Sequence, residues 1–141
     1  HIMRLAAEHN MKAMMQATIF FKREVKIALS KAGTGRSYKR RKKKGKGQFH
    51  IASVAGATPA PDTGVLVSSI SRRTERKKYE IRGFVGSDLD KIAAKADVGT
   101  DLEYGFYLEV GTKNMAARPY LRPTLMANMK KILEFFKKAT E

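Results

Sequence analysis

Apolar side chains recur at helical spacing in the first part of the chain. Between residues 11 and 32 they lie alternately three and four residues apart, which places them on one stripe of an α-helix. The stripe consists of Met11, Met14, Thr18, Phe21, Val25, Ala28 and Ala32. Gly33 follows directly and is a common stop signal. The pattern therefore predicts a long helix over residues 4–32.

The period changes to alternation in the middle of the chain. Residues 79–85 alternate apolar or small side chains with charged or bulkier ones, which is typical of a half-buried strand. Residues 71–76 can supply an antiparallel partner, and the turn is expected near residues 75–78. A β-hairpin is therefore the simplest arrangement.

Shorter elements are expected on both sides of this hairpin. Asp62 or Thr63 is placed to cap a helix of two turns that begins after Gly64. Residues 95–100 can form another short strand, and residues 88–94 are expected to form a loop or a helical turn. The middle of the chain is thus predicted to hold a short helix and a small antiparallel sheet.

Two further helices are predicted in the C-terminal third. Residues 101–110 carry aromatic and aliphatic side chains at the spacing of one helical face, and Gly111 suits a left-handed cap at its end. Pro123 marks the expected start of the last helix, because proline is tolerated at the first helical position but not in the interior. The buried stripe of that helix is predicted at Leu125, Met129, Ile132 and Phe136.

These elements define an α+β fold in a single domain over residues 1–141. A long N-terminal helix and a C-terminal helix are expected to pack on a small antiparallel β-sheet, which belongs to the body over residues 63–141. Residues 33–62 are rich in glycine, proline and cations without a sustained period, so a long mobile basic loop is predicted there. Residues 1–3 are interpreted as a cloning scar followed by the start methionine.

Charge adds information about partners. The chain has 29 Lys and Arg residues against 13 Asp and Glu residues, and its net charge of +16 favours polyanions or acidic proteins as partners. Half of this excess lies in one run without any acid: Arg36, Lys39, Arg40, Arg41, Lys42, Lys43, Lys44 and Lys46. Charged residues also interrupt the apolar N-terminal stretch, so a soluble intracellular protein with no membrane contact is expected.

The residue inventory argues against catalytic and cofactor chemistry. The chain has no Cys and only three His, which excludes thiol nucleophiles and leaves too few ligands for a zinc site. No hydrolase nucleophile motif, zinc-protease motif or phosphate-binding glycine loop occurs. The clustered carboxylates are interpreted as turn residues and helix caps rather than magnesium ligands: Asp88, Asp90, Asp97, Asp101 and Glu103. No enzyme activity, no metal and no cofactor are therefore predicted.

Three segments carry a more specific pattern. Residues 98–112 read Val-Gly-Thr-Asp-Leu-Glu-Tyr-Gly-Phe-Tyr-Leu-Glu-Val-Gly-Thr, and residues 115–123 read Met-Ala-Ala-Arg-Pro-Tyr-Leu-Arg-Pro. Upstream, residues 62–70 read Asp-Thr-Gly-Val-Leu-Val-Ser-Ser-Ile. Together they resemble the neck and tail-completion family of long-tailed phages and prophages, the lambda-type Z-like head–tail joining proteins. Val110 stands where the family pattern has an aromatic residue.

The resemblance implies which residues have structural or interface roles. They are Asp62, Thr63, Gly64, Leu66, Ile70, Tyr104, Tyr107, Leu108, Glu109, Gly111, Thr112, Arg118, Pro119, Leu121 and Pro123. The cationic run between residues 36 and 46 is expected to bind a partner or a polyanion. Within the C-terminal pattern, a charge-assisted contact between Glu109 and Arg118 is predicted to hold the loop over residues 111–117.

The resemblance also implies a function. It describes a non-enzymatic structural protein of the virion that forms or joins a hexameric ring, which completes the tail or connects it to the head. Its expected partners are further copies of the chain, the neighbouring head-connector and tail-terminator or tail-tube proteins, and genome DNA in passing. Its expected location is the head–tail junction of the virion, and the host cytoplasm during assembly.

Other interpretations remain open on the residues alone. A nucleic-acid-binding protein of ribosomal or chromatin type would use the run over residues 36–46, with Tyr38 and Phe49 nearby. A small nuclease would use the carboxylates between residues 97 and 103. For the basic run, docking onto an acidic protein is favoured over DNA contact or a merely solvated loop. Tight phosphate binding would oppose the passage of a genome.

Overall fold

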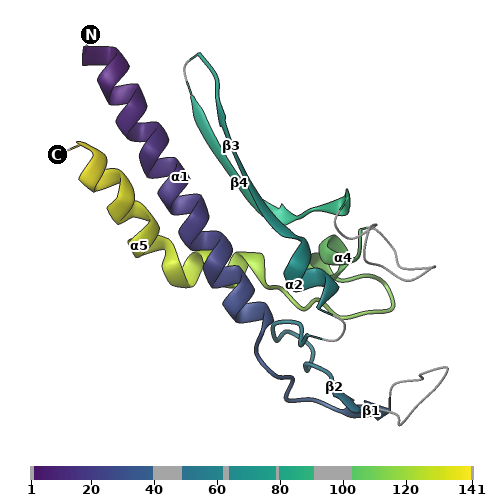
Figure 1. The fold of residues 1–141 in the computed structure, drawn as a ribbon. Coiled ribbons are helices and arrows are strands. Elements are labelled where there is room, and N and C mark those ends of the chain that lie inside the picture. The colour runs from purple at the N-terminus through teal and green to yellow at the C-terminus, as the bar shows by residue number, and fades with distance from the viewer. Residues whose placement is uncertain (1, 40–48, 62–63, 79, 91–102, 141) are drawn as a thin grey trace.

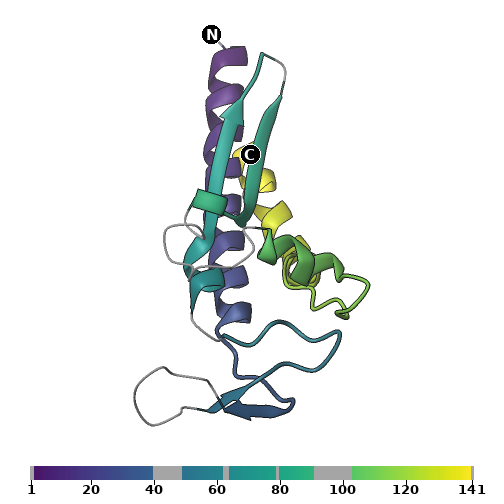
Figure 2. The ribbon, with the colours of Figure 1, turned by 90° about the vertical axis from the view of Figure 1, so that its right-hand side faces the viewer.

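The computed structural model describes residues 2–39, 49–61, 64–78, 80–90 and 103–140. Two long helices, α1 (Ile2–Leu29) and α5 (Leu121–Thr140), lie side by side and antiparallel (Figure 1). A β-hairpin runs along α1, and the shorter elements gather at the opposite end from the start of α1 (Figure 2). This arrangement confirms the predicted α+β fold with two long helices and antiparallel strands.

The first helix ends three residues before the predicted boundary. Ser30 closes it, since its N–H donates to the Ile27 carbonyl at 3.2 Å and its hydroxyl donates to the Lys26 carbonyl at 2.7 Å. A serine side chain that bonds the preceding turn in this way competes with continuation of the helix. Gly33 is therefore not the residue that stops α1.

The larger hairpin consists of β3 (Ile70–Arg76) and β4 (Ile81–Ser87), which pair antiparallel along their whole lengths. It confirms the hairpin predicted from the alternating pattern. β3 ends at Arg76 and β4 begins at Ile81, so the chain reverses slightly later than predicted, and the Lys77 N–H donates to the Glu80 carbonyl at 2.8 Å. Strand pairing thus continues through residues that the sequence pattern assigned to the turn.

A smaller hairpin lies in the segment that was predicted to be a loop. β1 (Ser37–Lys39) pairs antiparallel with β2 (Phe49–Ile51). The prediction of a loop throughout residues 33–62 is therefore wrong at these two strands. Strands of three residues are too short to show an alternating pattern among glycines and cations. Residues 40–48, which hold most of the cationic run, lie outside the described residues.

Two short helices flank the larger hairpin in the sequence. α2 (Val65–Ser69) follows Gly64, which has φ 76° and ψ 0°. Gly64 occupies the cap position and has no side chain with which to cap the helix. The two predicted cap residues, at positions 62 and 63, lie outside the described residues. α4 (Tyr104–Val110) confirms the helix predicted before Gly111, although it begins later than predicted, because Glu103 forms a turn.

Two further predictions concern the segment between β4 and α4. Residues 89–90 are helical, in agreement with the helical turn that was one of the two alternatives for residues 88–94. The rest of that segment and the strand predicted over residues 95–100 lie outside the described residues.

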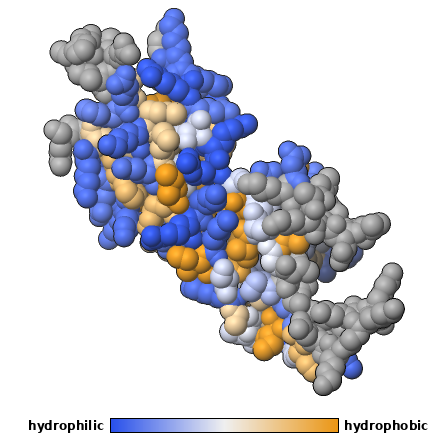
Figure 3. All heavy atoms as spheres, viewed as in Figure 1, coloured by the Kyte–Doolittle hydropathy of each residue, from blue (hydrophilic) through white to orange (hydrophobic). Residues whose placement is uncertain are grey.

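The buried core lies where α1, β3, α4 and the start of α5 meet. Its fully buried hydrophobic side chains are Val25, Leu29, Ile70, Leu108 and Tyr120. The predicted stripe of α5, from Leu125 to Phe136, is only half-buried. Hydrophobic side chains consequently reach the surface along the middle of the molecule, between hydrophilic ones (Figure 3).

Candidate functional site

The residues of the C-terminal pattern meet where α4 ends and α5 begins. We call the contact region formed by Gly105, Leu108, Glu109, Gly111 and Tyr120 the α4–α5 junction. Leu108 is 1% exposed and anchors α4 in the core. The polar groups of the junction are arranged around this anchor.

Glu109, in the last turn of α4, caps α5 with its carboxylate. Oε2 accepts hydrogen bonds from the backbone N–H groups of Tyr120 at 2.8 Å and Leu121 at 2.9 Å, and Oε1 accepts one from Arg122 at 2.9 Å. The next residue, Pro123, has no N–H, so the donors at the start of α5 are satisfied. The negative charge also interacts favourably with the dipole of α5. One side chain thus fixes the start of α5 against α4.

This cap explains why α5 begins at Leu121, two residues before the predicted start. Pro123 occupies the third helical position and not the first. Proline fits throughout the first turn, because the N–H groups there have no partner within the helix. The boundary is set by Glu109, which lies too far back in the sequence for a local pattern to reveal.

Among the described residues, the predicted contact between Glu109 and Arg118 is not formed. Both oxygens of Glu109 accept backbone hydrogen bonds, and none of the ion pairs recorded there joins the two side chains. Arg118 is held through its main chain, whose N–H donates to the Leu108 carbonyl at 2.7 Å. Its Nε is buried and has no hydrogen-bond partner among the described residues. The loop over residues 111–117, which returns the chain from α4 to α5, is therefore fixed by backbone contacts instead of a charge pair.

Gly111 turns the chain between the two helices in a conformation that is essentially restricted to glycine. Its φ of 79° and ψ of 176° differ from the predicted left-handed cap, for which ψ is about +47°. A Cβ at this position would lie 2.9 Å from the Ala117 nitrogen and 3.0 Å from the Met115 oxygen. Thr112 and Met115 close the loop with reciprocal N–H to carbonyl bonds of 2.8 and 3.2 Å. The loop is tight and leaves no room for a side chain at Gly111.

Tyr120 lies at the centre of the junction and is 1% exposed. Its hydroxyl donates to the Gly105 carbonyl at 3.3 Å. Burial raises the pKa of the Tyr120 hydroxyl above its ordinary value of 10.0, a hydrogen bond with Ser87 partly lowers it, and the charge of Glu109 raises it again. Gly105 allows this close packing, since a Cβ there would lie 2.6 Å from Ser87 Oγ.

Tyr120 and Gly105 are the junction residues that the sequence interpretation missed. Two signals pointed to them. An aromatic residue between two prolines is a candidate anchor, and a glycine inside a predicted helix indicates close packing.

The remaining residues of the family pattern have more ordinary positions. Ile70 belongs to the core, and Leu66 and Leu121 pack against it. Asp62 and Thr63 lie outside the described residues. The others lie at the surface or are half-buried: Gly64, Tyr104, Tyr107, Thr112, Pro119 and Pro123.

The β1–β2 hairpin carries the described part of the cationic run. Arg36 and Lys39 are exposed there, beside two exposed aromatic side chains, Tyr38 at 50% and Phe49 at 70%. The hairpin extends away from the two long helices (Figures 1 and 2). Cations next to exposed aromatic rings are suited to contact with a protein or a nucleic acid. The other predicted cations lie outside the described residues: Arg40, Arg41, Lys42, Lys43, Lys44 and Lys46.

Many large apolar side chains are exposed to solvent. In the described part of the chain, seven hydrophobic side chains are buried and fourteen large ones are exposed. Phe106 and Val110, one turn apart on α4, are 60% and 55% exposed.

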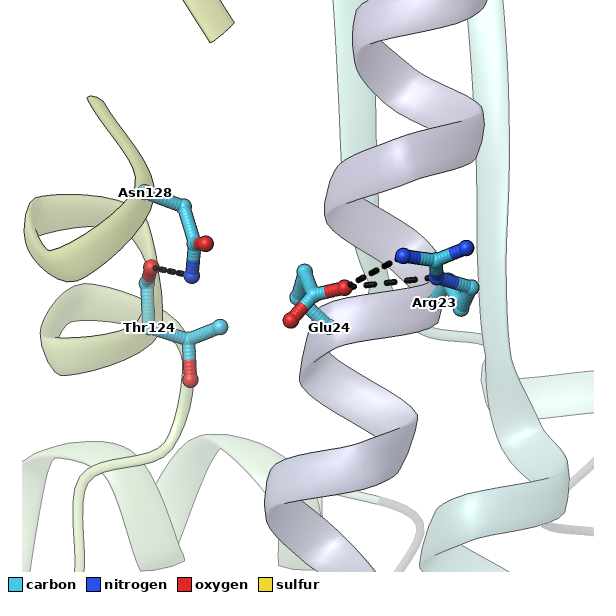
Figure 4. A network of polar contacts seen from close by, with 4 residues as sticks. All are labelled: Arg23, Glu24, Thr124 and Asn128. Atoms are coloured by element: carbon cyan, nitrogen blue, oxygen red, sulfur yellow. Dashed lines mark hydrogen bonds and ion pairs between the residues drawn. The ribbon is translucent and has the colours of Figure 1, made fainter. Parts of the chain in front are cut away.

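Polar side chains lie along the seam between α1 and α5. Figure 4 shows Glu24 of α1 on the side that faces Thr124 and Asn128 of α5, with Arg23 on the far side of Glu24. Arg23 donates to Glu24 Oε1 through Nη2 at 3.1 Å, and Asn128 Nδ2 donates to the Thr124 carbonyl at 2.9 Å. Each of these contacts joins residues of the same helix, so they position side chains without forming a ligand site.

Within the described residues, no group of three or more His, Cys, Asp or Glu side chains is placed to hold a metal ion. The Asp90 N–H donates to Asp88 Oδ1 at 3.1 Å, which is the turn role predicted for Asp88. Asp97 and Asp101 fall outside the described residues. No helix in the described ranges is long and apolar enough to cross a membrane.

Comparisons with protein-family models, with curated proteins and with solved structures found no match to this chain. The family resemblance therefore rests on residues 62–70, 98–112 and 115–123.

Proposed function

We propose that the chain is a structural virion protein of the head–tail junction of a long-tailed phage or prophage. It forms or joins a hexameric ring that completes the tail or connects it to the head. The proposal includes no catalytic activity and no cofactor. The ring would assemble in the host cytoplasm and remain in the virion.

The observation that carries the proposal is the α4–α5 junction. Glu109 belongs to the first half of the pattern, Leu-Glu-x-Gly-Thr, and it caps the helix that the second half, Arg-Pro-x-Leu-Arg-Pro, begins. Gly111 and Tyr120 pack the same region. The two halves therefore form one structural unit, and a match to both is more specific than two separate short matches.

The distribution of apolar surface supports an assembly role. In the part of the chain that the structure describes, fourteen large apolar side chains are exposed, and we infer that some of them contact neighbours. In the proposal these neighbours are further copies of the chain, a head-connector protein, and a tail-terminator or tail-tube protein. The basic β1–β2 hairpin would dock onto an acidic neighbour, since charge complementarity steers such encounters.

Deleting the gene from the phage or prophage that encodes the chain tests this function. We expect filled heads and unjoined tails to accumulate separately, as seen by electron microscopy of the lysate. Purified protein added to that lysate should restore joining, and heat-unfolded protein serves as the control. A normal virion yield without the gene would contradict the proposal.

A second candidate function is nucleic-acid binding through the cationic run. Exposed Tyr38 and Phe49 beside Arg36 and Lys39 favour it. If all eight cations of the run paired with phosphates, log K for duplex DNA should fall against log salt with a slope of about −7. A measured slope of that size would favour this candidate. A much shallower slope would count against it.

A further inference from the structure

A groove runs along α1 between the β3–β4 hairpin and α5. It consists of two adjoining cavities of about 560 and 450 Å³, which share Met14 and Phe136 in their linings. Its residues on α1 extend from Ala6 to Phe21, which corresponds to about 22 Å of helix. The lining does not include any residue of the α4–α5 junction or of β1–β2.

The packing of the neighbouring elements explains why this groove exists. β4 approaches α1 at Gly83, where a Cβ would lie 2.5 Å from Thr18 Cγ2 and 2.6 Å from Met14 Sδ. On another side of α1, α5 packs through Phe135, whose ring centroid lies 5.8 Å from that of Phe20. The hairpin and α5 therefore form two walls, and α1 forms the floor.

The two ends of the groove differ in chemistry. The inner part is lined by apolar side chains from three elements, including Phe21, Val85 and Ile132. The outer part has Arg76, Lys77 and Lys78 at the hairpin turn. The acid among its described lining residues, Glu80, is paired with Arg82 at 2.7 Å.

We propose that this groove binds an amphipathic helix of another protein, which carries an apolar stripe and acidic residues at one end. A groove of about 22 Å accommodates about four helical turns, and helix-in-groove binding uses such an apolar floor. The acidic residues would meet the cations of the hairpin turn. This proposal does not depend on the virion role.

Charge and polarity decide between the possible occupants. A second copy of the chain would bring a net charge of +16 to a cationic rim, which disfavours self-association there. A nucleic acid would complement the cations, but phosphate contacts dominate its affinity and the apolar part of the groove offers no partner for phosphates. An acidic amphipathic helix complements both parts of the groove.

The test uses the whole protein with isotope-labelled methionine methyl groups and a synthetic peptide of about 15 residues, or four helical turns. The peptide has leucines on one face and a cluster of glutamates in its first turn. We expect the Met14 methyl signal to shift on titration. Met15 and Met126, which are exposed but do not line the groove, should not shift. A peptide with alanine in place of leucine should leave Met14 unshifted.

Charge variants separate specific binding from general attraction to a basic protein. Arg76→Glu/Lys77→Glu should weaken peptide binding at least about tenfold. The matched variant Lys31→Glu/Lys113→Glu makes the same change at exposed positions that do not line the groove and should bind normally.

Three results would overturn the proposal: an unshifted Met14, equal weakening in both charge variants, or a Met14 shift that depends on protein concentration without peptide. The last of these would assign the groove to a second copy. The comparison of the leucine peptide with the alanine peptide uses the unsubstituted protein, so it tests the proposal even if a charge variant fails to fold.

Discussion

At Glu109, one carboxylate takes the place of the local cap residue that most helices use. Glu109→Ala removes the acceptor for the N–H groups of Tyr120, Leu121 and Arg122. We expect it to lower the free energy of unfolding by about 1–3 kcal/mol, and Glu109→Gln to lower it by less, because one oxygen acceptor remains. Urea unfolding measures both against Glu134→Ala, an exposed site on α5. Equal stability of Glu109→Ala and Glu134→Ala would contradict the cap.

A substitution at Gly111 tests whether the turn between α4 and α5 requires glycine. Gly111→Ala forces a Cβ into a conformation with φ 79°, at 2.9 Å from the Ala117 nitrogen. We expect a loss of about 1–3 kcal/mol in unfolding free energy. Gly86→Ala is the matched control, because a Cβ there meets nothing within 4 Å. A thermal melt in which both variants unfold together would show that the Gly111 turn tolerates a side chain.

The buried hydroxyl of Tyr120 predicts a dependence on alkaline pH. Its pKa is raised in the folded chain above the ordinary value of 10.0, so the unfolded chain loses this proton first. The stabilising contribution is therefore complete below about pH 10 and is lost as the pH rises through the raised pKa. We expect the wild type to lose more stability than Tyr120→Phe between about pH 9 and about pH 11. Parallel losses in the two proteins would rule out this assignment.

Among the elements, those with long periodic patterns were predictable and those fixed by distant contacts were not. α1, the β3–β4 hairpin and α5 follow from spacing alone, because each presents a sustained apolar pattern over several turns or pairs. β1 and β2 were missed, since three residues cannot establish a period.

The candidate site shows the same division. Leu108, Glu109 and Gly111 were found through the resemblance, whereas Gly105, Tyr120 and the contacts of the junction were not. Glu109 was predicted to pair with Arg118, whereas it caps α5 across eleven residues. A positive φ was expected at Gly111, but the extended ψ that sets the direction of the return loop was not. Such contacts depend on tertiary packing, which a local pattern does not encode.

The cationic run over residues 36–46 gives a prediction at the element scale. Neutralising five cations of the run to Gln should leave the fold intact and reduce head–tail joining: Arg40, Arg41, Lys42, Lys43 and Lys44. The reason is the loss of electrostatic attraction to an acidic neighbour. Thermal melts check the fold, and virion yield checks joining. Normal yield would remove the docking role, and normal joining with impaired genome ejection would shift the role to DNA contact.

As a whole, the molecule has a small core at one end and two further regions that offer surface to partners. The core surrounds Val25, Leu29 and Tyr120, while the apolar groove follows α1 beyond it and the β1–β2 hairpin extends away from it. In the proposed function, these regions would contact several neighbours at once. A monomer in solution is compatible with the proposed function, because a ring can form when the subunits meet an adjoining ring.

The most direct test of the proposed function is an averaged electron cryomicroscopy map of the virion that contains this chain. We expect a ring of six copies at the head–tail junction, in which the α1–α5 pair and the β3–β4 hairpin fit the density of each subunit. Cross-linking and mass spectrometry of the same particles should then join this chain to itself and to neck or tail proteins. A map with every ring of the junction accounted for by other proteins, and no density for this chain, would contradict the proposed function.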